Sequence, residues 1–275
     1  MLTLMYITND CSVAKIAERS GVDRIFIDLE INGKEERQGH LDTVISKHDI
    51  NDVRKIKEVL CNAELLVRVN PIYEDSKKEI DSVITQGADI VMLPYFKTVN
   101  EVEQFIEIVN GRAKVCLLCE TPEAVEEIDN ILKLKGIDEI HIGLNDLHLG
   151  YKMKFMFELL ADGTVEKLCK KFKEAGIKYG FGGIARVGAG ELPAEMIIRE
   201  HYRLGSTMAI LSRSFCNTKI LNDKKEIEEI FKTGIKAIRE VESEAKEYSN
   251  KEFEKNKKNI QKVVNKIVED KKNES

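Results

Sequence analysis

Two acidic side chains follow neighbouring apolar runs of the sequence and could bind a metal ion. Glu120 closes the run KVCLLCE, and Asp146 directly follows the run EIHIGLN. If both runs are parallel strands, the two carboxylates lie at equivalent positions at one edge of a sheet. Carboxylates without a nearby thiol or histidine pair suit Mg²⁺ or Mn²⁺ better than Zn²⁺. The sequence therefore predicts a divalent metal site that keeps positions for water and substrate oxygens.

Other polar residues end two earlier apolar runs. Asp28 and Glu30 belong to RIFIDLE, and Arg68 and Asn70 belong to LLVRVN. Side chains alternate along a strand, so Asp28 and Glu30 share one face, as do Arg68 and Asn70. The arginine fork binds carboxylates and developing oxyanions. Combined with a metal ion, this set predicts a chelating, oxygen-rich anionic substrate such as a 2-oxo acid.

These residues need a scaffold that brings several strand ends together, and the sequence repeats a strand and helix pattern. Each apolar, β-branched-rich run ends near a polar residue and precedes a stretch with helical spacing that a glycine often terminates. Runs without polar alternation indicate strands buried on both faces, so the pattern predicts a (β/α)8 TIM barrel. The predicted strands are 4–8, 24–30, 65–70, 89–95, 114–120, 139–145, 178–184 and 207–212.

The end of the chain differs from the rest. We expect a catalytic barrel domain over residues 1–222, with residues 223–275 forming the last barrel helix and a charged helical extension. The extension has an apolar stripe from Ile260 to Val268 that the barrel does not require. We favour a role for this stripe in a homo-oligomer. The alternative is a solvated terminal helix that frays.

The composition limits the classes of partner. The 275 residues include 43 Lys and Arg against 48 Asp and Glu, so the formal net charge is −5. This balance gives no basic surface of the kind that binds nucleic acid. The first ten residues lack the basic and long apolar regions typical of a signal peptide, and no apolar run in the sequence is long enough to span a membrane. We expect a cytoplasmic protein with a small-molecule carboxylate substrate and neither nucleic-acid nor membrane partners.

Some polar residues inside the apolar runs are better explained by the core. Cys116 and Cys119 lie three apart in one predicted strand and therefore face opposite sides, so they cannot share a metal ion. His141 lies within another run and is expected in the core or on the outer face of the strand.

Several loops after predicted strands could contact a substrate. The intervals 31–50 and 148–163 are longer than the others and follow carboxyl ends of strands, where active-site loops of such barrels lie. The glycine-rich segment 180–190 could bind phosphate through backbone N–H groups or serve only close packing. Arg186 and Arg213 could meet an anionic substrate or form surface ion pairs.

Taken in order, five motifs resemble a known family. Over roughly residues 13–215 the chain is similar to the HpcH/HpaI aldolase and citrate lyase beta-subunit family, within the pyruvate/phosphoenolpyruvate barrel superfamily. The motifs are DLE at 28–30, VRVN at 67–70, GADIVMLPYF at 87–96, LLCET at 117–121 and IHIGLNDLHLG at 140–150.

The resemblance implies a role for each site residue. Glu120 and Asp146 would be the Mg²⁺ ligands, and Arg68 would contact the carbonyl or enolate oxygen of the substrate. Asp28 and Glu30 would orient Arg68 or a bound water. The residues implied to hold the substrate carboxylate through backbone N–H groups are Gly143, Leu144, Asn145 and Asp146.

This chain departs from the family pattern at the general base. Family aldolases tend to carry a histidine directly after the acid of strand 2, where this chain has Ile31 and Asn32. Candidate bases are His40, His48 and a metal-bound water. Leu144 also stands where proline is common in the family.

The leading hypothesis is a divalent-metal-dependent carbon–carbon lyase or aldolase. It would act on a 2-oxo acid through the pyruvate enolate, or on a hydroxy acid as citrate lyase does. Three alternatives remain: an acyl-thioester (CoA-type) lyase or thioesterase, a phosphosugar enzyme on the same barrel, and a non-catalytic binding subunit.

Overall fold

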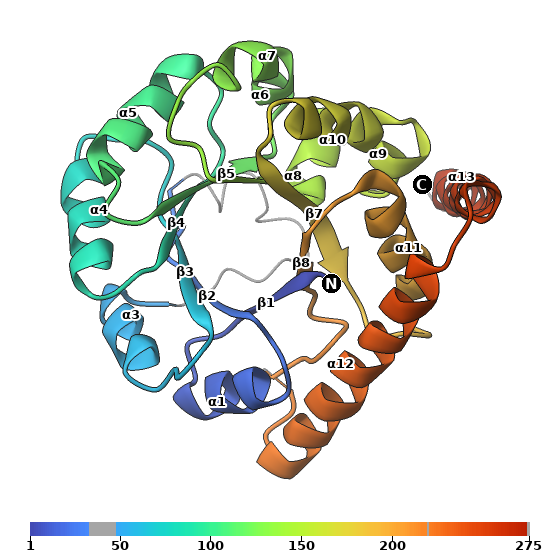
Figure 1. Ribbon diagram of the computed structural model, residues 1–275, viewed down its shortest axis with the longest axis horizontal. Coiled ribbons are helices and arrows are strands. Elements are labelled where there is room, and N and C mark those ends of the chain that lie inside the picture. The colour runs from blue at the N-terminus through green and yellow to red at the C-terminus, as the bar shows by residue number, and fades with distance from the viewer. Residues whose placement is uncertain (33–47, 219, 274–275) are drawn as a thin grey trace.

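A closed β-barrel lies at the centre of the computed structural model, which describes residues 1–32, 48–218 and 220–273 (Figure 1). Its strands are parallel and follow one another around the barrel in sequence order, and β8 pairs with β1. The predicted TIM barrel is therefore confirmed. The strands are β1 (Thr3–Ile7), β2 (Arg24–Asp28), β3 (Glu64–Arg68), β4 (Ile90–Leu93), β5 (Lys114–Cys119), β6 (Glu139–Ile142), β7 (Lys178–Ile184) and β8 (Met208–Leu211).

Helices connect the strands and form a ring around the barrel (Figure 1). Several begin at a capping residue: Thr98 and Glu101, for example, form a reciprocal capping box at the start of α5. The described helices are α1 (Cys11–Arg19), α3 (Ile50–Lys57), α4 (Ser76–Thr85), α5 (Val99–Val109), α6 (Pro122–Glu126), α7 (Ile128–Ile131), α8 (Leu144–Gly150), α9 (Glu158–Ala161), α10 (Thr164–Glu174), α11 (Ala194–Leu204), α12 (Lys224–Lys246) and α13 (Asn250–Asn273).

Alternation along the strands separates two apolar cores. Phe26, Leu66 and Cys116 belong to a small cluster formed by the strand faces that point into the barrel. Cys119 belongs instead to the larger cluster between the strands and the helices. The prediction that Cys116 and Cys119 face opposite sides of β5 is confirmed.

A buried ion pair crosses the lower barrel interior, near the N-terminal ends of the strands. The two Nη atoms of Arg24 on β2 donate to the two carboxylate oxygens of Glu139 on β6, at 2.6 and 2.7 Å. Both side chains are almost fully buried. Such a bidentate pair fills the end of the barrel opposite to the predicted site.

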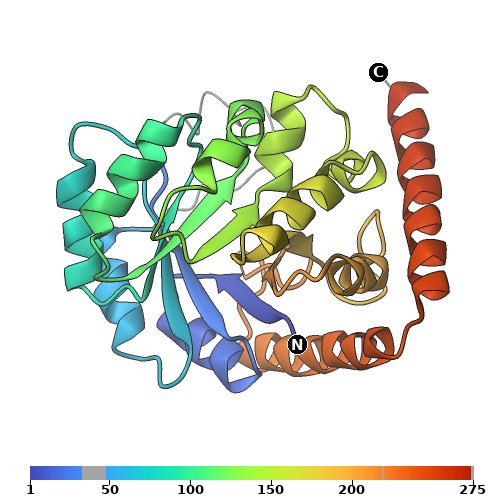
Figure 2. The ribbon, with the colours of Figure 1, turned by 45° about the horizontal axis from the view of Figure 1, so that its top comes forward.

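Two long helices end the chain and lie against the barrel at its outside. Helix α12 packs on α1 and α11, as expected of the last barrel helix. Helix α13 then turns and runs along the outside of α9 and α11 (Figure 2). Its apolar stripe, which includes Ile260 and Val264, is buried against these helices. The stripe is therefore covered within the same chain, while the predicted homo-oligomer stays a prediction. None of the described helices is long and apolar enough to cross a membrane.

Candidate active site

The C-terminal ends of β2 and β3 bring three of the predicted site residues into contact. Arg68 donates from Nε and Nη2 to the two carboxylate oxygens of Asp28, at 2.8 and 2.9 Å. Its Nη1 lies 3.3 Å from Oε2 of Glu30. This contact follows from strand register, because Asp28 and Arg68 are directly paired across the two strands. Below them, the Arg68 guanidinium lies over the ring of Phe26 at 5.7 Å.

The charge of Arg68 is fixed by its surroundings. Burial opposes the charged form, but the nearby carboxylates of Asp28, Glu30 and Glu120 outweigh it and raise the pKa of Arg68 further. The guanidinium therefore stays positive at every working pH. Asp28 occupies two of the five N–H donors of an arginine, so donors remain for other oxygen atoms.

Glu120 follows β5 and its carboxylate is held at a defined position. The side chain is 3% exposed, and Oε1 accepts a hydrogen bond of 3.1 Å from the backbone N–H of Tyr95. Tyr95 adopts a left-handed backbone conformation with φ 49°, which is strained for a residue other than glycine. On the other side, a Cβ at Gly143 would lie 2.6 Å from Oε2 of Glu120. Only glycine at position 143 therefore leaves room for this carboxylate.

Asp146 lies on a helix rather than at the end of a strand. Strand β6 ends at Ile142, and α8 begins at Leu144, so the prediction that the strand continues to residue 145 is wrong. The reason is local: the Leu147 N–H donates to the Gly143 carbonyl at 3.1 Å, which closes a helical turn directly after the strand. Asp146 is half-buried in this first turn.

The carboxylates fit a divalent cation of the magnesium type. Within the described ranges, no group of three or more His, Cys, Asp or Glu side chains is placed to hold a metal ion. Mg²⁺ needs only one or two protein carboxylates, with waters and substrate oxygens completing its octahedron, so a group of three is not required. Asp28, Glu30 and Glu120 are also buried near the Arg68 guanidinium, and their charges raise its pKa.

His48 contacts the site through its ring. The backbone N–H of Asp28 donates to Nδ1 of His48 at 2.9 Å. Because Nδ1 accepts this hydrogen bond, the neutral ring carries its proton on Nε2. The ring can then donate from Nε2, whereas a general base would need a lone pair there. The other candidate base, His40, lies outside the described residues.

Comparison with known proteins identifies the family of this barrel. The family model for HpcH/HpaI aldolase/citrate lyase matches residues 3–180. The chain belongs to this family. Aldolases and citrate lyases cleave carbon–carbon bonds, so the family is one of carbon–carbon lyases. No curated protein matches the sequence.

Solved structures resemble the whole HpcH/HpaI barrel at low sequence identity. An HpcH/HpaI aldolase from Desulfitobacterium hafniense DCB-2 is 16% identical, with a TM-score of 0.60 over 87% of this chain and 93% of the other. An HpcH/HpaI aldolase/citrate lyase family protein from Burkholderia cenocepacia J2315 is 15% identical, with a TM-score of 0.61 over 87% and 94%. The citrate synthase SbnG is 16% identical, with a TM-score of 0.59 over 86% and 92%. At this identity the likeness shows the fold.

Asn70 has a structural use in this HpcH/HpaI barrel. Its Oδ1 accepts hydrogen bonds from the backbone N–H groups of Ile31 and Asn32, at 2.8 and 2.9 Å. Its Nδ2 donates to Glu79 on α4 at 2.8 Å. Glu79 was not among the predicted residues, because nothing in its helical segment distinguishes it from a surface acid. Asn70 and Glu79 thus hold the residues that directly follow Glu30.

Two histidines and two arginines considered from the sequence lie on α8, on β6 and after β7 and β8. His148 is buried on α8, with Nδ1 3.2 Å from the carbonyl oxygen of Leu144. His141 is fully buried, so the expectation that it lies in the core is confirmed. Arg186 and Arg213 are exposed after β7 and β8.

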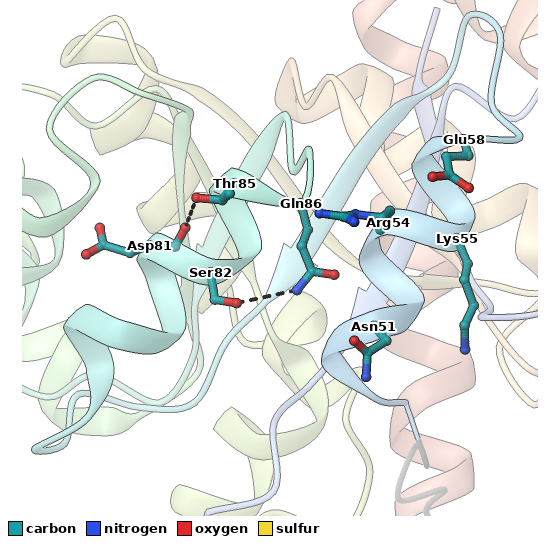
Figure 3. Close-up of a pocket in the computed structure, with 8 residues that line it drawn as sticks. All are labelled: Asn51, Arg54, Lys55, Glu58, Asp81, Ser82, Thr85 and Gln86. Atoms are coloured by element: carbon teal, nitrogen blue, oxygen red, sulfur yellow. Dashed lines mark hydrogen bonds between the residues drawn. The ribbon is translucent and has the colours of Figure 1, made fainter.

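A groove of about 620 Å³ lies on the outer surface of the HpcH/HpaI barrel, between α3 and α4 (Figure 3). It carries charges of both signs, and some of its polar groups already bond to one another. None of its residues belongs to the predicted site. They are Asn51, Arg54, Lys55, Glu58, Asp81, Ser82, Thr85 and Gln86.

Proposed function

We propose that this protein is a divalent-metal-dependent aldolase or carbon–carbon lyase that acts on a 2-oxo acid through its enolate. The observation that carries the proposal is the position of Arg68. Its charge is fixed by Asp28 and Glu30, and Glu120 contributes to the same electrostatic environment at the C-terminal ends of the strands. In barrels of this kind, catalysis takes place at that end.

Arg68 would stabilise the negative charge that develops on the substrate. When the carbon–carbon bond of a hydroxy 2-oxo acid breaks, the electron pair moves onto the carbonyl oxygen of the fragment that becomes the enolate. Arg68 offers N–H donors and a full positive charge to that oxygen. One preorganised donor of this kind is worth about 3–4 kcal/mol of transition-state stabilisation. Asp28 keeps the guanidinium plane fixed through two hydrogen bonds.

Glu120 and Asp146 would hold Mg²⁺ or Mn²⁺, with water and substrate oxygens as the other ligands. When bound, such an ion polarises the 2-oxo group and the carboxylate beside it as a Lewis acid. The Tyr95 N–H supports this use because it holds the Glu120 carboxylate, and glycine at position 143 leaves room for that carboxylate. The backbone N–H groups of Gly143, Leu144 and Asn145 stay our prediction for the substrate carboxylate.

His48 would act on the site through Asp28. Its Nδ1 accepts a hydrogen bond from the backbone N–H of Asp28, and the Asp28 carboxylate in turn accepts from Arg68. We therefore assign His48 a positioning role and leave the transfer of the hydroxyl proton to a carboxylate or a water of the site. A 2-oxo acid or citrate-like substrate agrees with the names of the structural neighbours, which include aldolases and a citrate synthase.

Turnover of a panel of hydroxy 2-oxo acids and hydroxy-acyl thioesters, followed by proton NMR, tests the proposal. With Mg²⁺ the wild-type protein should release pyruvate from at least one hydroxy 2-oxo acid, and EDTA should abolish the reaction. Glu120→Gln should lower turnover by about 100-fold or more. The control Glu123→Gln changes an exposed acid that pairs with Lys97 and should leave turnover unchanged. Equal turnover in EDTA, or cleavage of thioesters alone, would contradict the proposal.

A further inference from the structure

His141 makes a directional hydrogen bond inside the barrel. Its ring is 0% exposed, and Nε2 lies 3.2 Å from the carbonyl oxygen of Gly182 on β7. A carbonyl can only accept, so Nε2 carries the proton. Among the described residues, Nδ1 has no hydrogen-bond partner. The ring is therefore a neutral donor whose single polar contact is a carbonyl of the neighbouring strand.

The Gly182 carbonyl lies in an irregular part of β7. Gly180 pairs with Met208 and Gly183 pairs with Ile210, so β7 contains one more residue than β8 over this interval. This is a β-bulge, which leaves a residue out of the regular pairing and redirects the strand. Gly182 has φ +54°, a conformation that glycine adopts without strain.

The bulge contacts the start of α8. A Cβ at Gly182 would lie 2.8 Å from Cδ1 of Leu144, so the Leu144 side chain occupies the space beside the bulge. Leu144 is fully buried and is the first residue of α8, in the same turn as Asp146. The preceding residue, Gly143, packs directly on the Glu120 carboxylate. The position of the bulge therefore affects the segment that carries Asp146 and that packs, through Gly143, on the Glu120 carboxylate.

We propose that His141 is a positioning residue for the Glu120 and Asp146 pair, because its Nε2–H fixes the Gly182 bulge on which Leu144 packs. This inference rests on the proposed function, in which the two carboxylates bind the metal ion. Burial lowers the pKa of His141 to about 4, so the neutral ring persists throughout the neutral range.

His201 offers a matched control on the other side of β7. It is also 0% exposed, and its ring stacks on Phe181 at 3.7 Å. Its Nδ1 lies 2.7 Å from Oγ of Ser206, away from the predicted ligands. Replacing either histidine by phenylalanine removes a buried imidazole that contacts β7. Only the change at residue 141 removes the hydrogen bond to the bulge.

Three variants of the full chain test the inference: His141→Phe, His141→Gln and His201→Phe. Hydrogen exchange followed by mass spectrometry reports the backbone of residues 143–150, and electron paramagnetic resonance reports Mn²⁺ affinity. His141→Phe should speed exchange in this segment and weaken Mn²⁺ binding by about 10-fold or more, the usual effect of removing a residue that supports a metal ligand. His141→Gln keeps an N–H donor and should restore most of both properties.

The control separates positioning from a general loss of stability. His201→Phe should lower the melting temperature while leaving Mn²⁺ affinity and exchange at residues 143–150 as in the wild type. The inference is overturned if His141→Phe matches His201→Phe in both measurements. A wild-type protein that binds no Mn²⁺ would contradict the metal part of the proposed function, and the exchange comparison alone would then decide the inference.

Discussion

Asp28 forms hydrogen bonds through both its carboxylate and its backbone N–H, and this makes it the residue through which His48 can act. The carboxylate accepts from Arg68, and the backbone N–H donates to Nδ1 of His48. A ring that accepts at Nδ1 holds Asp28, and with it Arg68, in place. The same ring could serve as a base only after giving up that contact.

Two substitutions at His48 distinguish positioning from base catalysis. His48→Asn keeps an acceptor near the position of Nδ1 and should retain turnover within about 5-fold, whereas His48→Phe should lose about 10- to 100-fold. The measurement is the pH profile of kcat for the best substrate of the panel. If both variants lose activity equally and the same inflection disappears from the profile, His48 is the base and the positioning role is wrong.

For the candidate site, the sequence predicts which residues lie near one another better than it predicts the hydrogen bonds between them. Asp28, Glu30, Arg68 and Glu120 follow from polar residues at strand ends, because register brings such residues together at one end of a parallel barrel. The hydrogen bond from the Tyr95 N–H to Glu120 depends on a left-handed backbone conformation at Tyr95, which no local sequence pattern predicts. Hydrogen bonds of this kind depend on tertiary geometry.

At the scale of single elements, β6 ends earlier than predicted, and β7 has the predicted bounds but contains a bulge that the sequence does not predict. The apolar run through residue 145 reads as one strand, yet the helix begins at Leu144 because a turn closes on Gly143. The glycines of β7 suggested a phosphate-binding loop or close packing. The structure places Gly180 and Gly182 in close packing, against Met208 and Leu144. The bulge was missed because glycine alone does not specify a change of register.

His141, the buried hydrogen-bond donor on β6, should make the free energy of unfolding depend on pH. The pKa of His141 is lowered from 6.5 to about 4, mainly by burial, so the folded state favours the neutral ring. Between those values the unfolded chain binds more protons. The stabilisation is therefore complete above pH 6.5 and is lost as the pH falls towards 4, by about 3 kcal/mol in total.

Urea unfolding at pH 7 and pH 4.5 measures this dependence. The wild-type free energy of unfolding should fall between the two pH values by about 2–3 kcal/mol more than that of His141→Gln, which cannot titrate at this position. Parallel pH dependences in the two proteins would show that His141 keeps an ordinary pKa in the fold.

At the scale of the whole molecule, the sequence predicts a single barrel with a helical extension, and the structure shows where the extension lies. The apolar stripe of α13 predicts a buried face but does not show what covers it, since packing on the same chain and packing on a second copy require the same pattern. In the structure, α13 packs on helices of its own chain. Lys257 pairs with Glu166 on α10 at 2.7 Å, and Asn256 donates to the Met196 carbonyl on α11 at 3.1 Å.

Helix α13 should therefore contribute to the stability of the monomer. Ile260→Ala removes a side chain that is 1% exposed and should cost about 2–5 kcal/mol in free energy of unfolding. Lys262→Ala, on the exposed side of the same helix, should change it by less than about 0.5 kcal/mol. Denaturant unfolding combined with light scattering gives both stability and mass. If Ile260→Ala changes the oligomeric state at unaltered monomer stability, the stripe serves assembly instead.

Enolate formation is the central claim, and exchange of the pyruvate methyl hydrogens in D₂O tests it most directly. With Mg²⁺ and the wild-type protein, the methyl proton signal should decay well above the buffer rate. Arg68→Ala should slow this decay by about 100- to 1,000-fold. Arg112→Ala, a surface control that pairs with Asp81, should leave it unchanged. Wild-type exchange no faster than buffer, or equal exchange in Arg68→Ala, would contradict the account.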